Sequence, residues 1–176
     1  MALAVLGLGS NIERERHLSR ALDALATLAA PATLQPSRVF ESPPVGFEDE
    51  RRFFNLVVAL ETELAPTVLN ARCKAIEHAN GRPSGPSRFV ARTLDIDLLL
   101  WGDSVGKQGG VVLPRSDIER YAFVLHPLAE LLPNHRHPAL GVSFAELWAA
   151  FDDSTQPHWA VDFIWNGTAI SRADPD

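Results

Sequence analysis

The chain contains one cysteine, Cys73, among its 176 residues. A single thiol excludes an internal disulfide and a metal site built from several cysteines. Scarcity of cysteine is typical of proteins that fold in a reducing compartment, so we expect a cytoplasmic protein. We interpret Cys73 as a small apolar helix residue.

Positive charge is in the minority, since 16 Lys and Arg face 22 Asp and Glu and give a net charge of −6. Proteins that bind nucleic acid in general carry a basic surface, so we expect no nucleic-acid partner. A small polyphosphate ligand remains compatible with this charge, because it needs only a local group of basic side chains.

Long apolar runs are absent as well. Residues 1–9 are apolar, but they are too few to span a membrane and carry no basic residues before the apolar run, so we expect no membrane partner. A hydrophobic content of 46% and a mean hydropathy near zero indicate a globular protein. The length suits a single domain, which we place at residues 1–170, with a polar, frayed tail at 171–176. We favour a monomer.

Hydrophobic periodicity predicts an alternation of strands and helices over the first hundred residues. We expect a strand, a helix, two strands, a helix and a strand; the strands lie at residues 2–8, 37–42, 53–60 and 94–100, and the second helix at 66–79. This order is that of a ferredoxin-like α+β unit. Its four-stranded antiparallel sheet carries both helices on one face and leaves the other face for a site and for C-terminal additions.

A Gly-x-Gly pattern follows the first strand, at Gly7 and Gly9. A dinucleotide-binding turn would need a third glycine where Ile12 stands, so we interpret the glycines as ordinary turn residues. Ser10 or Asn11 is then the expected N-cap of the first helix.

The last third of the chain predicts shorter elements. We expect a loop or hairpin at residues 102–110, a short strand at 111–113, a helix at 144–151 capped by Ser143, and a final edge strand at 158–165. His135 and His137 have the spacing of a metal-binding pair. We read them as solvated loop residues, because prolines flank them on both sides.

Two aspartates interrupt an otherwise apolar strand at Asp95 and Asp97. Alternate residues of a strand share a face, so the two Cα atoms lie about 6.6 Å apart with their side chains on the same side. Such a pair can be the solvated face of an antiparallel sheet, or it can hold one or two Mg²⁺ ions. Arg82, Arg88 and Arg92 precede the pair and favour a complex of Mg²⁺ with a polyphosphate.

Asn55 is the polar exception in the apolar strand at 53–60. A buried amide needs hydrogen-bond partners, which a neighbouring turn or a ligand with paired donors and acceptors can supply.

These residues fall within motifs that resemble a known family, the 6-hydroxymethyl-7,8-dihydropterin pyrophosphokinases of folate biosynthesis. The resemblance covers roughly residues 3–135, and its most specific part is the sequence from Arg92 to Asp97. The motifs appear in the family's order: Gly7-Leu8-Gly9-Ser10-Asn11, Glu41-Ser42-Pro43-Pro44-Val45-Gly46, Phe53-Phe54-Asn55, Gly81-Arg82, Arg92-Thr93-Leu94-Asp95-Ile96-Asp97, and Ala122-Phe123-Val124-Leu125-x-Pro127-Leu128.

The resemblance implies an enzyme that transfers diphosphate from ATP to the hydroxymethyl group of the pterin. It implies two Mg²⁺ ions on Asp95 and Asp97, with Arg82 and Arg92 neutralising phosphate charge. From their positions in the chain we add Glu77, Arg88 and Arg115 to Arg82 and Arg92 as expected nucleotide contacts. The resemblance also implies a pterin held between Phe53 and Phe123, with its edge read by Asn55 and the segment Ser42, Pro43, Pro44 and Val45.

The chain departs from the family at four places. Phe89 stands where the family has Trp, Ala91 where it has Pro, and Tyr121 where it has Arg; the segment around Arg115 lacks a usual His. If Arg115 points into the site, it replaces that His as a phosphate ligand. Otherwise it is a surface residue and the contact is missing.

Two other functions remain open from the sequence. A metal-dependent phosphohydrolase would use the same aspartates with water as the acceptor. A diverged, non-catalytic pterin or nucleotide sensor would explain the departures at Arg115 and Tyr121.

Overall fold

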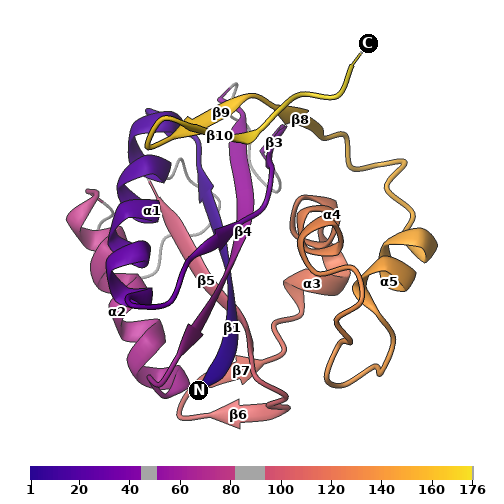
Figure 1. Cartoon of the computed structure of the whole chain (residues 1–176). Helices are drawn as coiled ribbons and strands as arrows, with labels where there is room; N and C mark the ends of the chain where they lie inside the picture. Colours follow the sequence, from indigo (N-terminus) through magenta and orange to yellow (C-terminus); the bar gives the residue numbers. More distant parts are fainter. Residues whose placement is uncertain (45–50, 82–93, 176) are drawn as a thin grey trace.

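The computed structural model describes residues 1–44, 51–81 and 94–175. Figure 1 shows how their helices and strands are arranged. In chain order they are β1 Ala2–Ser10, α1 Arg14–Ala29, β2 Gln35–Pro36, β3 Val39–Ser42, β4 Phe53–Thr62, α2 Pro66–Ala79, β5 Asp95–Trp101, β6 Gly106–Gln108, β7 Val111–Leu113, α3 Asp117–Arg120, α4 Ala122–Leu131, α5 Phe144–Ala150, β8 Trp159–Val161, β9 Phe163–Trp165 and β10 Thr168–Ser171.

Strand β1 is central to the main sheet. It pairs antiparallel with β4 over its whole length and with β5 on its other side. The sheet has the order β5-β1-β4-β3-β8, and β2 also pairs with β4. It therefore has six strands rather than the four we expected. The additional strands are β8, which pairs with β3, and the short β2, which pairs with β4.

The side chains of the central strands divide between two cores. Leu6, Leu8 and Leu56 pack with the inner sides of α1 and α2. Their neighbours Val5 and Val57 point the other way and pack with α4 and α5. Alternate residues of a strand face opposite sides, so one apolar run supplies both cores. Each fully buried leucine stabilises the fold by about 1.5–3 kcal/mol.

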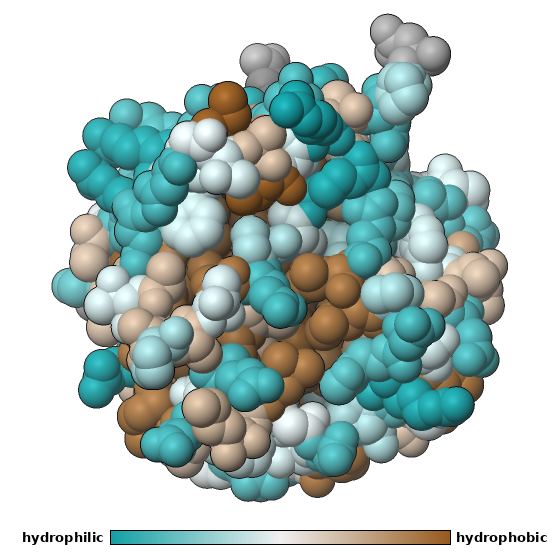
Figure 2. All heavy atoms as spheres, in the orientation of Figure 1, coloured by the Kyte–Doolittle hydropathy of each residue, from teal (hydrophilic) through white to brown (hydrophobic). Residues whose placement is uncertain are grey.

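The molecule thus has three layers. Helices α1 and α2 cover one face of the sheet, and α3, α4 and α5 lie beyond the other face (Figure 1). The expectation that both early helices share one face is confirmed. The C-terminal additions divide: α3, α4 and α5 lie opposite, whereas β9 and β10 contribute Phe163, Trp165 and Ile170 to the core on the α1 side. Figure 2 shows apolar residues exposed through the middle of one side of the molecule, bordered by hydrophilic residues.

The start of α1 corrects two expectations. β1 continues through Ser10, which pairs with Phe54, so Gly7 and Gly9 lie inside a strand and not in a turn. The N-cap of α1 is Glu13, in a left-handed conformation with φ of 43°, and not Ser10 or Asn11. The pairing partner offered by β4 outweighs the turn propensity of the Gly-x-Gly sequence.

Several C-terminal expectations hold and others need correction. Ser143 caps α5 by accepting a hydrogen bond from the Glu146 N–H, and β6 and β7 form the expected hairpin. The expected final strand is divided into β8 and β9, which belong to different sheets. His137 is 2% exposed and not solvated, and its Nδ1 accepts from two backbone N–H groups of its own loop.

The tail from Ser171 is not frayed. Ser171 is buried, and Asp174 forms an ion pair with Arg38 at 2.9 Å. The N–H of Ala173 donates to the carboxylate of Asp162. Polar composition alone suggested a free end, but these polar groups find partners on the domain.

No helix in the described parts of the chain combines the length and the apolar character that crossing a bilayer requires.

Candidate functional site

A cavity of about 360 Å³ opens on the face of the sheet opposite α1 and α2. The strands β1, β4 and β5 form its floor, the end of β3 one wall, and residues around α3 and the start of α4 the other. This volume is in the range of small-molecule sites. Its lining residues are Gly7, Leu8, Gly9, Ser42, Pro43, Phe53, Asn55, Leu56, Lys74, Asp95, Asp97, Leu99, Arg115, Asp117, Tyr121, Phe123 and Val124.

The acidic side of the cavity lies on β5. Asp95 and Asp97 are opposite Gly9 and Gly7 of β1, so no side chain from the neighbouring strand covers them. Both point into the cavity, as their spacing predicts, and the side chain of Asp97 is 20% exposed. The interpretation of the pair as a plainly solvated face is therefore wrong for Asp97.

Burial and the nearby charge of Asp95 raise the pKa of Asp97 to about 6. Lys74 and Arg115 act in the opposite direction, with a nitrogen of each within 4 Å of the Asp97 carboxylate, at 3.6 and 3.7 Å. Two half-buried carboxylates that disfavour each other's charge are stabilised by a bound cation. The described residues contain no group of three or more His, Cys, Asp or Glu suited to a metal. Two carboxylates on one strand face are a donor set that fits Mg²⁺, which takes one or two carboxylates and completes its shell with phosphate oxygens and water.

The backbone between the two aspartates is held from α2. The carboxylate of Glu77 accepts a hydrogen bond of 2.7 Å from the Ile96 N–H, and Lys74 Nζ donates to the Ile96 carbonyl at 2.8 Å. Lys74 and Glu77 also bond to each other at 3.0 Å. Glu77 is buried and does not line the cavity, so its expected place among the nucleotide contacts is corrected to a position behind β5.

Arg115 points into the cavity, which is the arrangement that its expected role requires. Its backbone N–H donates to the Leu99 carbonyl at 2.9 Å, which ties the segment to β5. Its guanidinium lies between Asp97 and Asp117, with Nε 3.2 Å from the Asp117 carboxylate. Lys74 and Asp117 also line the cavity and were not among the site residues predicted from the sequence. The i,i+3 pair of Lys74 with Glu77 on a helix next to β5 was the available signal for the lysine.

The opposite side of the cavity is aromatic and amide-bearing. Phe53, Asn55 and Phe123 line it together with Ser42 and Pro43, as expected. Asn55 is 8% exposed, and its Nδ2 lies 3.5 Å from the Ser42 hydroxyl.

Tyr121 adds an aromatic ring that the sequence argument treated only as a departure. It stacks on Phe123 with centroids 5.0 Å apart and planes 14° apart. Both rings line the cavity, so they present a wide apolar wall to a ligand.

Some expected residues are not brought to the cavity or are not described. Pro44 is described but does not line it. Those outside the described residues are Val45, Arg82, Arg88, Phe89, Ala91 and Arg92.

The model of one protein family, 7,8-dihydro-6-hydroxymethylpterin-pyrophosphokinase (HPPK), matches residues 5–133. The chain belongs to this family. A relative from Pseudomonas aeruginosa named 2-amino-4-hydroxy-6-hydroxymethyldihydropteridine pyrophosphokinase is 39% identical over 146 residues, 82% of this chain and 89% of its own. The "Folic acid synthesis protein fol1" of Schizosaccharomyces pombe is 31% identical over 77% of this chain and 19% of its own.

Solved structures of HPPK proteins share the fold. One described as HPPK-DHPS in complex with substrates has a TM-score of 0.67 and 14% identity. The match covers 88% of this chain but only 44% of that longer one. The match to the family model ends at residue 133, just after α4, so residues 134–176 lie beyond it.

Proposed function

We propose that this protein transfers diphosphate from ATP to the hydroxymethyl group of 6-hydroxymethyl-7,8-dihydropterin, giving AMP and the pterin diphosphate, in folate biosynthesis. The observation that carries the proposal is that one cavity has carboxylates on β5 and an amide with aromatic rings on β4 and α4, separated only by β1. Family membership supports the same reaction. The strand order β5-β1-β4-β3 also supports a ferredoxin-like description of the core.

The pterin is assigned to the aromatic side. Asn55 carries both a donor and an acceptor on a rigid strand, which matches the paired groups along the edge of a pterin. The rings of Phe53, Phe123 and Tyr121 supply flat apolar surfaces for the heterocycle. A phosphohydrolase needs no such wall, so the cavity favours the transferase.

The nucleotide phosphates are assigned to the acidic side. Asp95 and Asp97 would hold two Mg²⁺ ions, which neutralise the phosphates and polarise the phosphorus under attack. Glu77 and Lys74 fix the peptide between the two carboxylates, so these keep their mutual placement without substrate. Arg115 would hold phosphate oxygens, and Arg82, Arg88 and Arg92 are assigned to the same task from the resemblance.

The reaction needs little covalent help from the protein. The hydroxymethyl oxygen attacks the β-phosphorus, AMP leaves, and the hydroxyl proton passes to solvent or a phosphate oxygen. Catalysis then comes from holding the two substrates in line and stabilising phosphate charge. The acidic wall on β5 and the aromatic wall on β4 both flank β1, and this placement is what supports that alignment.

An AMP-release assay with ATP, Mg²⁺ and hydroxymethyl-dihydropterin tests the proposal. AMP that forms only when the pterin is present supports the transferase. Nucleotide breakdown without pterin would indicate a phosphohydrolase, and binding without turnover would indicate a sensor. The Asp97→Asn protein serves as the matched inactive control.

The expectations of a cytoplasmic, monomeric enzyme without nucleic-acid or membrane partners stay predictions.

A further inference from the structure

Part of the chain beyond the family match contacts the pterin side of the cavity through the sheet. Residues 134–176 follow the matched region, and their strand β8 pairs antiparallel with β3. The pairs are Val39 with Val161, Phe40 with Ala160, and Glu41 with Trp159. Without β8, the short strand β3 would be the edge of this sheet on that side.

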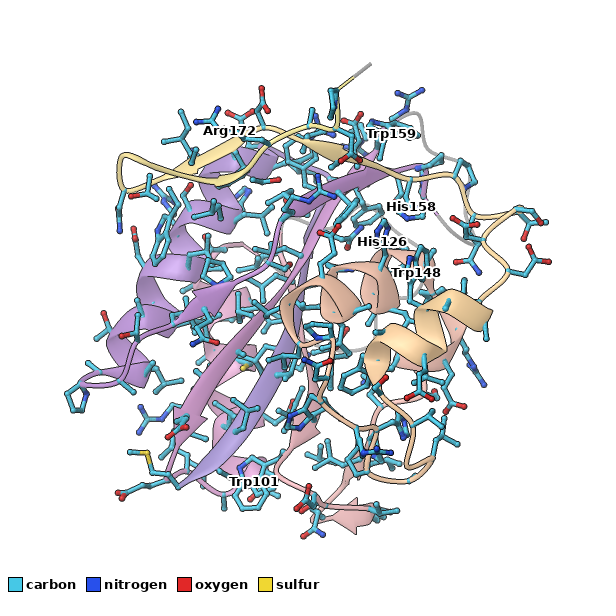
Figure 3. The ribbon with its side chains drawn as sticks, turned by 45° about the vertical axis from the view of Figure 1, so that its right-hand side comes forward. Trp101, His126, Trp148, His158, Trp159 and Arg172 are labelled. Atoms are coloured by element: carbon cyan, nitrogen blue, oxygen red, sulfur yellow. The ribbon has the colours of Figure 1, made fainter. Side chains whose placement is uncertain are left out.

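A side-chain hydrogen bond of Trp159 fixes the end of this pairing at Glu41. The Trp159 Nε1 donates a 2.9 Å hydrogen bond to the Glu41 carboxylate, whose other oxygen accepts from Arg14 at 2.6 Å. The Glu41 side chain is only 16% exposed. Figure 3 shows Trp159 at the end of the sheet, beside His158. A hydrogen bond to a charged acceptor fixes position more strongly than a neutral one.

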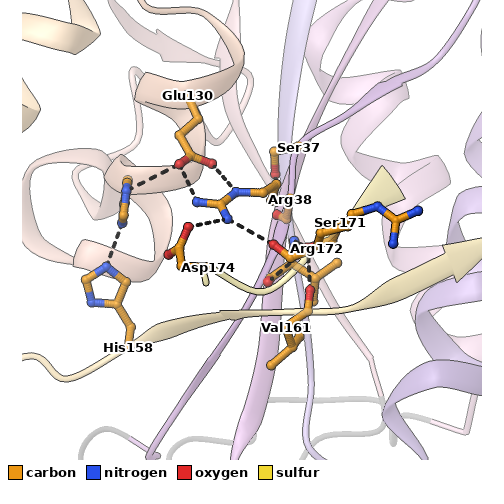
Figure 4. Close-up of polar contacts among 10 residues, drawn as sticks. Ser37, Arg38, Glu130, His158, Val161, Ser171, Arg172 and Asp174 are labelled. Atoms are coloured by element: carbon orange, nitrogen blue, oxygen red, sulfur yellow. Dashed lines mark hydrogen bonds and ion pairs between the residues drawn. The ribbon is translucent and has the colours of Figure 1, made fainter. Parts of the chain in front are cut away.

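Ser171 fixes the other end, where Val39 pairs with Val161. Its buried hydroxyl accepts from the Val39 N–H at 2.9 Å and donates to the Val161 carbonyl at 2.6 Å, so one side chain joins β3 to β8. Arg38, just before β3, is also held in place, in this case by ion pairs and a hydrogen bond of its guanidinium (Figure 4). It contacts Glu130 of α4 at 2.6 Å, and Asp174 and the Arg172 carbonyl at 2.9 and 3.0 Å.

The other side of β3 faces the ligand. Ser42, at the end of β3, and the following Pro43 line the cavity. Phe40 is paired with Asn55, and the Asn55 amide lies 3.5 Å from the Ser42 hydroxyl. Any shift of β3 relative to β4 therefore moves Ser42 against the amide assigned to the pterin edge.

We propose that the C-terminal segment from Trp159 to Asp174 sets the position of β3 for heterocycle binding, with Trp159 and Ser171 as positioning residues. Among the described residues, the side-chain bonds of Trp159 and Ser171 go to β3 and β8, and no residue of the segment lines the cavity. We therefore expect its effect to be confined to one substrate. The inference rests on the proposed function, because it assigns the β3 wall to the pterin.

The Trp159→Phe protein tests the contact with Glu41. Phenylalanine keeps an aromatic ring beneath the Arg52 guanidinium, which lies 5.0 Å from the Trp159 ring, and removes the N–H donor to Glu41. The KM and Kd for the pterin should rise about three- to tenfold. The KM for ATP and kcat should stay within about twofold, because β5 and Arg115 are not coupled to β8.

Trp165→Phe is the matched control. Trp165 lies in the same segment and donates the same kind of bond, 2.9 Å to the Asp23 carboxylate, but on the α1 side of the molecule. The Trp165→Phe protein should lose about as much thermal stability as the Trp159→Phe protein, but it should bind the pterin as the wild type does. Equal pterin constants for the two variants would overturn the inference, and so would parallel losses for pterin, ATP and kcat in Trp159→Phe.

Ser171→Ala tests the contacts of Ser171 independently. It should raise the pterin Kd in the same direction, measured by titration without turnover. Ser154→Ala, at an exposed position just before this segment, is its control. A folded Ser171→Ala protein with wild-type pterin binding would contradict the role of Ser171. If the wild type binds no pterin, the proposed function itself fails; if it binds pterin and neither variant differs, only this inference fails.

Discussion

Asn55 occupies the space that a side chain at Gly9 would need. A Cβ at Gly9 would lie 2.6 Å from the Asn55 Oδ1, closer than any van der Waals contact allows. The two residues are opposite each other in the β1–β4 ladder. The glycine in β1 therefore permits the conformation of the amide assigned to the pterin.

Gly9→Ala should weaken pterin binding at least tenfold, since the added methyl group displaces Asn55 from its position. Gly7→Ala provides the comparison, because its Cβ would meet the Leu99 side chain at an ordinary contact distance, with the nearest atom at 3.4 Å. Pterin titration of both proteins checks this. Equal pterin affinities would show that Asn55 adapts or does not bind the ligand.

Asp97→Asn should abolish most activity and yet stabilise the metal-free protein near pH 7.5. The pKa of Asp97 is raised to about 6 in the fold, so its charge opposes folding above that pH. The cost grows between pH 4 and 6 and vanishes below pH 4, where the carboxyl is protonated in both states. The gain in the free energy of unfolding should be about 1–3 kcal/mol.

Urea unfolding in EDTA at pH 4 and pH 7.5 measures this gain. Asp103→Asn, at an exposed carboxylate outside the cavity, is the control and should change little. An Asp97→Asn protein that is less stable than the wild type at pH 7.5 would contradict the electrostatic account.

Arg115→Ala should raise the KM for ATP or lower kcat at least tenfold, a loss of about 1.4 kcal/mol. Arg120→Ala removes an exposed arginine that does not line the cavity and should be near wild type. Arg115→His should keep part of the activity and lose it as pH rises past about 6.5, where imidazolium is lost. Unaltered ATP kinetics in Arg115→Ala would show that this segment does not contact the nucleotide.

The contribution of His126 to stability should fall as the pH drops below about 6.5, opposite in direction to that of Asp97. The His126 Nδ1 lies 2.7 Å from His158 Nε2, a hydrogen bond that requires one neutral ring, and the His126 ring stacks on Trp148. Burial lowers the pKa of His126, so the folded state binds its proton less readily than the unfolded chain and loses stability as the pH falls through that window.

Urea midpoints at pH 7.5 and 5.5 should therefore converge in the His126→Gln protein. The exposed His78 provides the control: His78→Gln should keep the wild-type pH dependence. A wild-type difference that persists in His126→Gln would place the acid sensitivity elsewhere.

Strand periodicity was sufficient to predict which side chains face the cavity. The alternation along β4 and β5 placed Asn55, Asp95 and Asp97 on one side and Phe54 and Ile96 on the other, as the structure has them. This succeeds because the two-residue repeat of a strand is local.

Contacts between distant segments could not be read in this way. The strand character of Gly9 depends on its pairing with Asn55, and the position of Glu77 depends on the N–H of Ile96. The ion pair of Arg38 with Asp174 joins residues far apart in the chain, where polar composition alone suggested a free tail. Such features depend on which strand becomes a neighbour, which no local pattern encodes.

Gly7 and Gly9 leave β1 without side chains between the two walls of the cavity. This has a consequence for how such a site can diverge. The carboxylates on β5 and the amide on β4 are two strand intervals apart, about 9–10 Å, and backbone hydrogen bonds set that span. Side chains at the rim, such as Arg115 or Tyr121, can be exchanged without altering it. Proteins with this fold can therefore exchange the residues that bind the phosphates or the heterocycle one at a time. The span between the carboxylates on β5 and the amide on β4 stays the same, because the backbone sets it.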